Sequence, residues 1–278
     1  MSSDQLADIG KRIAATRQLE TVFTAMRGLA AARSREAQKS LDGVRSYAHA
    51  VGEAIQTALV CAPNEPVTPP AAPKHIVLAF CSEQGFVGAF DERVLRAATR
   101  AGSPASFYVV GQKGKASAIE HGVTVAWSTP MAAHAVDAPA VAERIADALY
   151  EEVASGERTH VTLVHMAPSV VSGLDIVTRP LIPLDLARFP AASNRAPPIF
   201  NLSPPLLLSE LAEEYVFAEL CEATLLSFAS ENFARMQAMS SARSNVRKTL
   251  DELTARHRQL RQEQITEELM ELSRSSGV

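Results

Sequence analysis

Both ends of this sequence are poor in the residues that interrupt helices. Residues 1–62 contain no proline, and residues 206–276 contain neither proline nor glycine. Because proline breaks helices and glycine weakens them, this scarcity excludes a series of short elements in the C-terminal segment. A single helix over residues 206–276 would be roughly 105 Å long at about 1.5 Å per residue. Such a helix needs a partner helix along its length to bury its apolar stripe.

Cysteine, aromatic residues and long apolar runs are also scarce. The aromatic fraction is 5%, as expected where a thin helical seam replaces a thick core, and the net charge of −4 gives no indication of nucleic-acid binding. Cys61, Cys81 and Cys221 match no metal or redox spacing, which predicts reduced thiols in a cytosolic compartment. No run approaches the ~20 apolar residues of a membrane-spanning helix. Residues 1–12 lack the apolar core of a signal peptide, which predicts neither secretion nor organelle import.

The C-terminal segment carries the repeat of a left-handed coiled coil. Its seam positions alternate in steps of three and four, which keeps one face turned toward a partner helix. Arg243 and His257 interrupt this seam, and His257 is interpreted as a polar residue that sets the register. These flaws predict an asymmetric partner. The seam consists of Met236, Met239, Arg243, Val246, Leu250, Leu253, His257 and Leu260, followed after a stutter by Ile265, Leu269 and Leu272.

The partner is expected within the same chain, in residues 1–62. Four glycines weaken this helix by about 1 kcal/mol each relative to alanine. One of them, Gly28, lies among alanines and is a candidate for close helix approach. We therefore predict one long N-terminal helix, antiparallel to the C-terminal one. Its apolar positions at helical spacing are Leu6, Ile9, Ile13, Thr16, Phe23, Met26 and Ala30.

Prolines are concentrated in residues 63–73 and 180–205, and they separate a middle segment from the two helical ends. This middle segment has a different hydrophobic pattern. Short apolar runs alternate there with helical patterns, which predicts a mostly parallel sheet covered by helices. The fold class is thus α/β: a helical hairpin with an inserted domain, organised as residues 1–62, 74–186 and 206–276. The expected strands are 75–80, 106–111, 123–127 and 159–166 with an edge strand within 172–184, and the expected helices are 92–101, 113–120 and 138–153.

Two glycine-bearing loops of the middle segment lie where a phosphate-binding loop would be. Gly85 and Gly88 lack the third glycine of the dinucleotide motif, and no Gly-Lys-Ser or Gly-Lys-Thr occurs. Both this loop and the one with Gly111 and Gly114 are interpreted as turns. The histidines and cysteines show no metal-binding spacing. No cofactor, metal or catalytic residue is therefore predicted.

Motifs at the two ends carry a resemblance to a known family. The C-terminal motif consists of Ser230-Glu231, Arg235-Met236, Ala238-Met239, Asn245, Leu250, Arg261-Gln262, Ile265-Thr266 and Glu268-Leu269. The N-terminal motif consists of Ile9, Arg12-Ile13, Thr24-Ala25-Met26 and Ala30-Ala31. In both, the chain resembles the gamma subunit of the F-type ATP synthase, the central rotor shaft. The likeness is strong over roughly the first forty and the last fifty residues.

The chain also departs from the family pattern. The loop of residues 82–91 keeps Gly85 and Gly88 but loses the basic and cysteine positions of the family turn. Gly28 replaces a bulky residue, and the tail after Leu272 differs from the usual small apolar ending. These departures indicate a divergent bacterial branch, with protons or sodium ions as the coupling ion.

The resemblance implies a non-catalytic rotor subunit that couples ion transport through a membrane ring to ATP synthesis or hydrolysis. The implied partners are the alpha and beta catalytic subunits, the epsilon subunit and the membrane c-ring. The implied location is peripheral, at the cytoplasmic side of a bacterial plasma membrane. Two alternatives have other functions: a small-molecule-binding α/β enzyme with a helical dimerisation hairpin, and a coiled-coil adaptor. By motif match, the subunit contacts are Met26, Arg27, Arg261, Gln262 and Thr266.

Overall fold

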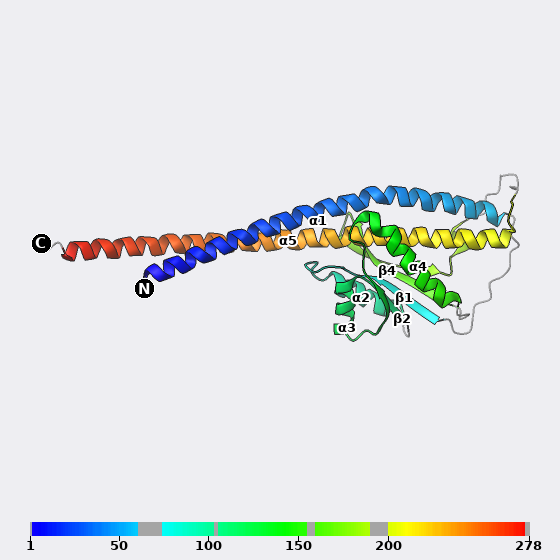
Figure 1. Ribbon diagram of the computed structural model, residues 1–278, viewed down its shortest axis with the longest axis horizontal. Helices are drawn as coiled ribbons and strands as arrows, with labels where there is room; N and C mark the ends of the chain where they lie inside the picture. The colour runs from blue at the N-terminus through cyan, green and yellow to red at the C-terminus, as the bar shows by residue number, and fades with distance from the viewer. Residues whose placement is uncertain (1, 61–73, 103–104, 155–158, 190–199, 276–278) are drawn as a thin grey trace. The chain divides into compact units, whose positions relative to one another are not determined.

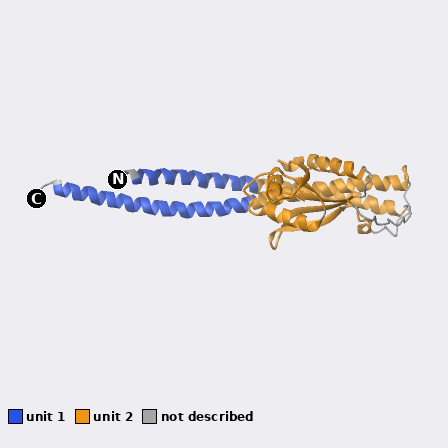
Figure 2. Ribbon diagram, turned by 90° about the horizontal axis from the view of Figure 1, so that it is seen from below, with its two compact units in different colours: residues 1–30, 235–278 blue, residues 31–234 orange. Residues whose placement is uncertain are grey.

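Two compact units make up the chain in the computed structural model, which describes residues 2–60, 74–102, 105–154, 159–189 and 200–275. One unit, here called the shaft unit, comprises residues 1–30 and 235–278 (Figure 2). The other, the sheet unit, comprises residues 31–234. Two long helices contribute to both units: α1 (Ser2–Leu59) and α5 (Pro204–Ser275) (Figure 1).

The sheet unit contains a five-stranded sheet with the strand order β3-β2-β1-β4-β5. Neighbouring strands are parallel except for β5, which runs antiparallel to β4 at the edge. The predicted mostly parallel sheet and its edge strand are therefore confirmed. The strands are β1 (Lys74–Phe80), β2 (Ser106–Val110), β3 (Val125–Thr129), β4 (Thr159–Ser169) and β5 (Gly173–Ile182).

One strand begins later than the sequence indicates. The pattern predicts a strand from Val123, but β3 begins at Val125. The backbone N–H of Val123 donates instead to the carbonyl of Ala118, 2.9 Å away, and so closes the end of the preceding helix. Gly122 makes this possible with a φ of +73°.

Alternate residues of β1 enter two different cores. Leu78 and its neighbours on one face pack against α4 (Ala138–Ala154) and the two long helices. Ala79 and its neighbours on the other face pack against α2 (Phe90–Ala101) and α3 (Gln112–Glu120). This two-residue alternation explains why all of β1 from Ile76 onward is buried, as parallel strands covered on both faces are.

The four glycines of α1 do not interrupt the helix. A side chain at Gly52 would be crowded, because its Cβ would lie 3.2 Å from the ring of Phe189. At Gly28 nothing lies within 4 Å of that position, and the residue is exposed. The prediction that Gly28 allows close helix approach is therefore wrong. The crowded glycine of α1 is Gly52, and its closest contact is with the ring of Phe189 rather than with α5.

In the shaft unit α1 and α5 lie side by side and run in opposite directions (Figures 1 and 2). All eight α5 seam residues from Met236 to Leu260 are partly or fully covered, as are the predicted apolar positions of α1. The antiparallel hairpin is thus confirmed. Beyond Leu260, α5 continues past the start of α1, and Ile265 and Leu269 are 49% and 62% exposed.

Some sequence features fall outside the described residues or inside the core. Cys61 and the prolines of residues 63–73 lie outside the described ranges, as do Pro190, Pro197 and Pro198. Cys81 and Cys221 are buried free thiols, as expected from the cysteine pattern. Burial raises the pKa of Cys221 to about 11, so this thiol stays protonated at neutral pH.

His165 on β4 is buried in a neutral state. Its ring meets Phe80 edge-on, and its Nδ1 lies 3.1 Å from the carbonyl oxygen of Met166, which requires the proton on Nδ1. Within the described structure Nε2 has no hydrogen-bond partner. Burial above all, together with the positive charge of Arg179, lowers the pKa of His165 to about 4, while Met166 and Glu222 oppose this shift.

We expect acid to destabilise the sheet unit through this histidine. Between pH 6.5 and 4 the unfolded chain binds a proton at His165 that the folded chain does not. The free energy of unfolding therefore decreases as the pH is lowered. The decrease is about 3 kcal/mol across that window. Urea unfolding of the wild type and of His165→Leu at several pH values measures this decrease. The difference in free energy of unfolding between the two proteins should change by about 3 kcal/mol across the window. His160→Leu, on the same strand, is the control, and an equal pH slope in all three proteins would contradict the assignment.

Candidate functional site

The loop after β1 is closed by its own side chains. The carboxylate of Asp91, which is only 6% exposed, accepts hydrogen bonds from the backbone N–H of Ser82 at 2.7 Å and from the Ser82 hydroxyl at 2.6 Å. Charge-assisted bonds of this length are among the stronger ones in proteins. They fix the turn that contains Gly85 and Gly88, in agreement with its interpretation as a strand-to-helix turn.

A second carboxylate occupies the place where a phosphate group would be held. Glu83 accepts hydrogen bonds from the backbone N–H groups of Gln112, at 3.1 Å, and Met131, at 2.8 Å. Gln112 is the first residue of α3, and helix N-termini attract anions because their N–H groups are unpaired. The chain therefore supplies its own anion at this edge of the sheet.

Close backbone packing explains the second glycine pair. A Cβ at Gly114 would lie 1.9 Å from the Cβ of Cys81, so no larger residue fits there. Gly111 has a φ of +107°, and its N–H donates to the carbonyl of Thr129 at 2.9 Å. These glycines bring the start of α3 against the end of β1, and they form the predicted turn.

Part of the C-terminal motif holds the loop in place. Glu231 on α5 is 3% exposed, and its carboxylate accepts a hydrogen bond of 3.2 Å from the backbone N–H of Gln84. One turn earlier on α5, the hydroxyl of Ser227 lies 3.4 Å from the carbonyl oxygen of Phe80, to which it donates. These contacts give Glu231 a structural role within the sheet unit. Sequence reasoning missed it, because no local pattern links residues 147 positions apart.

The five predicted contact residues lie in two separate places on the shaft unit. Arg27 is exposed on α1 beside the half-buried Met26, while Arg261, Gln262 and Thr266 are exposed near the end of α5. Glu20 of α1 pairs with α5 at Arg243 and Arg247, which gives the register of the two helices. Counted from that level, the two groups are roughly 33–42 Å apart along the shaft. The structure thus brings Arg261, Gln262 and Thr266 together but not with Met26 and Arg27.

A polar layer in the seam makes the shaft asymmetric. Glu20 occupies the α1 seam between Thr16 and Phe23, where the apolar pattern has a gap. Its Oε1 lies 3.4 Å from Nε of Arg243 and 3.3 Å from Nε of Arg247. The sequence predicts the seam position of Arg243 but not its partner, because the ion pair joins residues more than two hundred positions apart. The one local indication of this partner is the charged residue at position 20, which interrupts the apolar pattern of α1.

These observations define the class of protein. It is a helical coiled-coil protein with an inserted α/β domain, and its glycine loop is closed by its own carboxylates. No helix in the described residues has the length and apolar character needed to cross a membrane. Within the same residues, no group of three or more histidine, cysteine, aspartate or glutamate side chains is arranged to hold a metal ion.

Comparison with known proteins agrees with the resemblance of the terminal motifs. The sequence model of the ATP synthase family matches residues 5–276, and the chain therefore belongs to that family. It is 28% identical to the ATP synthase gamma chain of Allorhizobium ampelinum, over 96% of this chain and 97% of the other. It is also 28% identical to the ATP synthase gamma chain of Solibacter usitatus, over 96% of both chains.

Solved structures show the same fold at lower identity. A chain from the rotational state 3 structure of Euglena gracilis mitochondrial ATP synthase superposes with a TM-score of 0.63 at 12% identity, covering 99% of this chain and 94% of that one. A chain from the central stalk and c-ring structure of Tetrahymena thermophila mitochondrial ATP synthase gives 0.57 at 19% identity, covering 80% and 99%. The long hairpin and the inserted sheet are thus shared architecture.

Proposed function

We propose that this chain is the gamma subunit, the central stalk, of a rotary F-type ATP synthase. It couples ion flow through a membrane ring to ATP synthesis or hydrolysis on a ring of alpha and beta subunits. The family match over residues 5–276 carries this proposal. The antiparallel pair of helices in the shaft unit supports it, because such a pair has the form of an axle.

The surface of the shaft unit suits differential contact with surrounding subunits. The polar layer at Glu20 lies in one part of the pair, whereas the exposed apolar residues Ile265 and Leu269 lie at the end of α5. Because the shaft is a pair of two different helices, it has no rotational symmetry, and at a given angle it contacts each catalytic subunit differently. Contacts that differ between conformational states shift the populations of those states, and this is how rotation is coupled to nucleotide affinity.

The remaining parts of the proposal follow from this role. The chain itself is non-catalytic, and ATP chemistry occurs on the alpha and beta subunits. The epsilon subunit and the c-ring contact the sheet unit, and membrane association is indirect, at the cytoplasmic side of a bacterial plasma membrane. The division into residues 1–62, 74–186 and 206–276 stays a prediction of how the chain is organised.

Co-purification tests the assignment directly. A tagged chain, co-expressed with the alpha, beta and epsilon subunits of an F-type ATP synthase from the same organism, should elute as one complex with ATPase activity. A chain that elutes alone as a monomer or homodimer under the same conditions would overturn the proposal and favour the enzyme or adaptor alternatives.

The purified chain alone should not bind Mg-ATP. Its α3 N-terminus and loop N–H groups are already bonded to Glu83 and Asp91, so a phosphate would have to displace these carboxylates. Isothermal titration should show no binding tighter than about 100 µM, equivalent to roughly −5.5 kcal/mol. The assembled complex, titrated in parallel, is the positive control, and tight binding by the chain alone would contradict the non-catalytic role.

The predicted contact residues Arg261 and Gln262 allow a sharper test. If they donate hydrogen bonds to catalytic-subunit loops only at some rotary angles, Arg261→Ala with Gln262→Ala should leave the complex assembled but slow ATP-driven ion pumping. A charge-assisted hydrogen bond contributes about 1.5–3 kcal/mol, so removing one that forms in the rate-limiting state slows turnover roughly tenfold or more.

The chain offers a matched control for this test, since an Arg-Gln pair recurs three residues earlier. Arg258→Ala with Gln259→Ala removes the same groups from exposed positions of the same helix. Pumping and ATPase rates are measured in vesicles containing each assembled complex. Equal rates in the wild type and both double variants would remove Arg261 and Gln262 from the contact site.

A further inference from the structure

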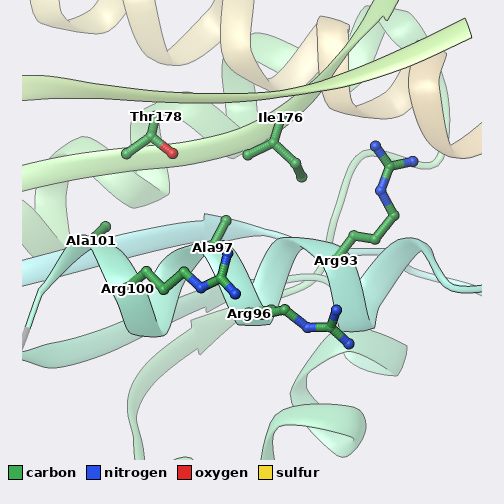
Figure 3. Close-up of a pocket in the computed structure, with 7 residues that line it drawn as sticks. All are labelled: Arg93, Arg96, Ala97, Arg100, Ala101, Ile176 and Thr178. Atoms are coloured by element: carbon green, nitrogen blue, oxygen red, sulfur yellow. The ribbon is translucent and has the colours of Figure 1, made fainter. Parts of the chain in front are cut away.

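A row of three arginines borders a groove in the sheet unit. Arg93, Arg96 and Arg100 are spaced three and four residues apart on α2, so their side chains lie along one side of the helix. They line a groove of about 420 Å³ whose opposite wall is Ile176 and Thr178 of β5 (Figure 3). Because β5 is the edge strand, the groove is at the margin of the sheet.

The floor of this groove is small and apolar. Ala97 and Ala101 lie on the side of α2 that faces Ile176 and Thr178 (Figure 3). Their methyl groups leave room that a larger residue would fill. The groove therefore combines an apolar base with a charged rim, and this combination suits a peptide segment better than a free ion.

The positive charge of the rim is only partly balanced within the chain. Arg93 donates a hydrogen bond of 2.9 Å to the carbonyl oxygen of Leu174, and the carboxylate of Asp175 is also close enough to interact with its charge. Arg96 pairs with Glu92, but both side chains are at least half exposed, and such pairs contribute little free energy. Arg100 lies in the last turn of α2, where a cation also favours the helix dipole. A net positive rim remains on a chain whose overall charge is −4.

The spacing of the arginines identifies the kind of ligand. From Arg93 to Arg100 the helix rises roughly 10 Å, which is more than one phosphate group spans. In an extended segment, side chains on one face recur about every 6.6 Å, so two carboxylates two residues apart match such a row. Guanidinium groups bind carboxylates in a bidentate manner.

We infer that this groove binds an acidic segment of another subunit of the complex. The segment places two or more carboxylates along Arg93, Arg96 and Arg100 and an apolar side chain over Ala97 and Ile176. This inference rests on the proposed function, because it requires the other subunits to be present. It adds a specific surface and a specific ligand chemistry to the sheet unit.

Carbodiimide cross-linking in the assembled complex tests this inference. Arg96→Lys with Arg100→Lys keeps the charge and provides amines, which the reagent joins to nearby carboxylates as amides with loss of water. Mass spectrometry should identify a link from position 96 or 100 to an aspartate or glutamate of another subunit. Arg35→Lys, an exposed position on α1 in the same unit, is the control. Links only to Glu92 of the same chain, or no link, would overturn the inference.

A second variant measures the contribution of the charge. Arg96→Gln with Arg100→Gln should weaken binding to the cross-linked subunit at least tenfold in low salt and reduce its salt dependence, whereas Arg35→Gln should not. Inorganic phosphate and phosphatidylglycerol vesicles are tested as competing anions on the intact chain. Arginine-dependent binding of either, without an inter-subunit cross-link, would assign the groove to a phosphate group and overturn the inference. If the complex assembles and only the cross-link is missing, the proposed function stands and the inference about the groove fails. If the wild-type chain does not assemble with the other subunits, the proposed function and the inference both fail.

Discussion

Glu219→Gln is expected to destabilise the sheet unit by about 3 kcal/mol. Glu219 is 4% exposed on α5, and it forms ion pairs with Arg179 of β5 and with Arg188, the latter at 3.3 Å. Removing one partner of a buried ion pair leaves an uncompensated charge, and this typically costs about 3–5 kcal/mol. The lower end applies because Arg188 is 42% exposed and regains water, and because Arg179 still has the charge of Glu222 nearby. Urea unfolding followed by circular dichroism measures the decrease.

Glu210→Gln is the matched control for this prediction. It changes the same group on the same helix, at an exposed position. Exposed charges contribute about 0–1 kcal/mol, so the control should be destabilised by less than about 1 kcal/mol. If both variants were destabilised equally, the buried network around Glu219 would not be the cause.

Leu253→Pro is expected to abolish assembly of the complex. Leu253 lies within the continuous part of α5 that pairs with α1 in the shaft unit. Proline there removes one helix hydrogen bond and clashes with the preceding turn, at a cost of about 3 kcal/mol or more. The kink also misaligns every seam contact beyond it. Co-purification of the alpha and beta subunits with the variant chain measures the effect.

Leu253→Ala separates the effect of the broken backbone from that of the missing side chain. Alanine favours the helix and removes only part of a half-covered side chain, so the complex should still form. Unchanged pumping by Leu253→Pro would show that α5 need not be continuous at this position.

Local patterns predicted the elements of this fold because those patterns depend on neighbouring residues only. The alternation in β1 and the three-and-four steps from Met236 to Leu260 are visible in any window of about ten residues. The hairpin followed because no other segment is long enough to cover α5. What sequence reasoning missed depends on tertiary pairing: Glu20 with Arg243, Glu83 with two backbone N–H groups, and Glu231 with the loop at Gln84.

The candidate site was less accessible to sequence reasoning than the fold. Gly28 was misread because a run of small residues has the same local pattern whether or not another helix approaches, and the crowded glycine is Gly52. The arginines of α2 were not singled out, because three basic residues on a short helix are ordinary in sequence. Their significance depends on β5 lying opposite, and β5 is about eighty residues away.

The unequal lengths of the two helices in the shaft unit affect its elasticity. Where α1 and α5 are paired, twisting must shear two packed surfaces against each other. Past the start of α1, the last turns of α5 form a single helix, whose bending and twisting meet no such resistance. In a rotating subunit, we therefore expect a torque applied at the tip to deform the shaft more than the same torque applied near Glu20 and Arg243.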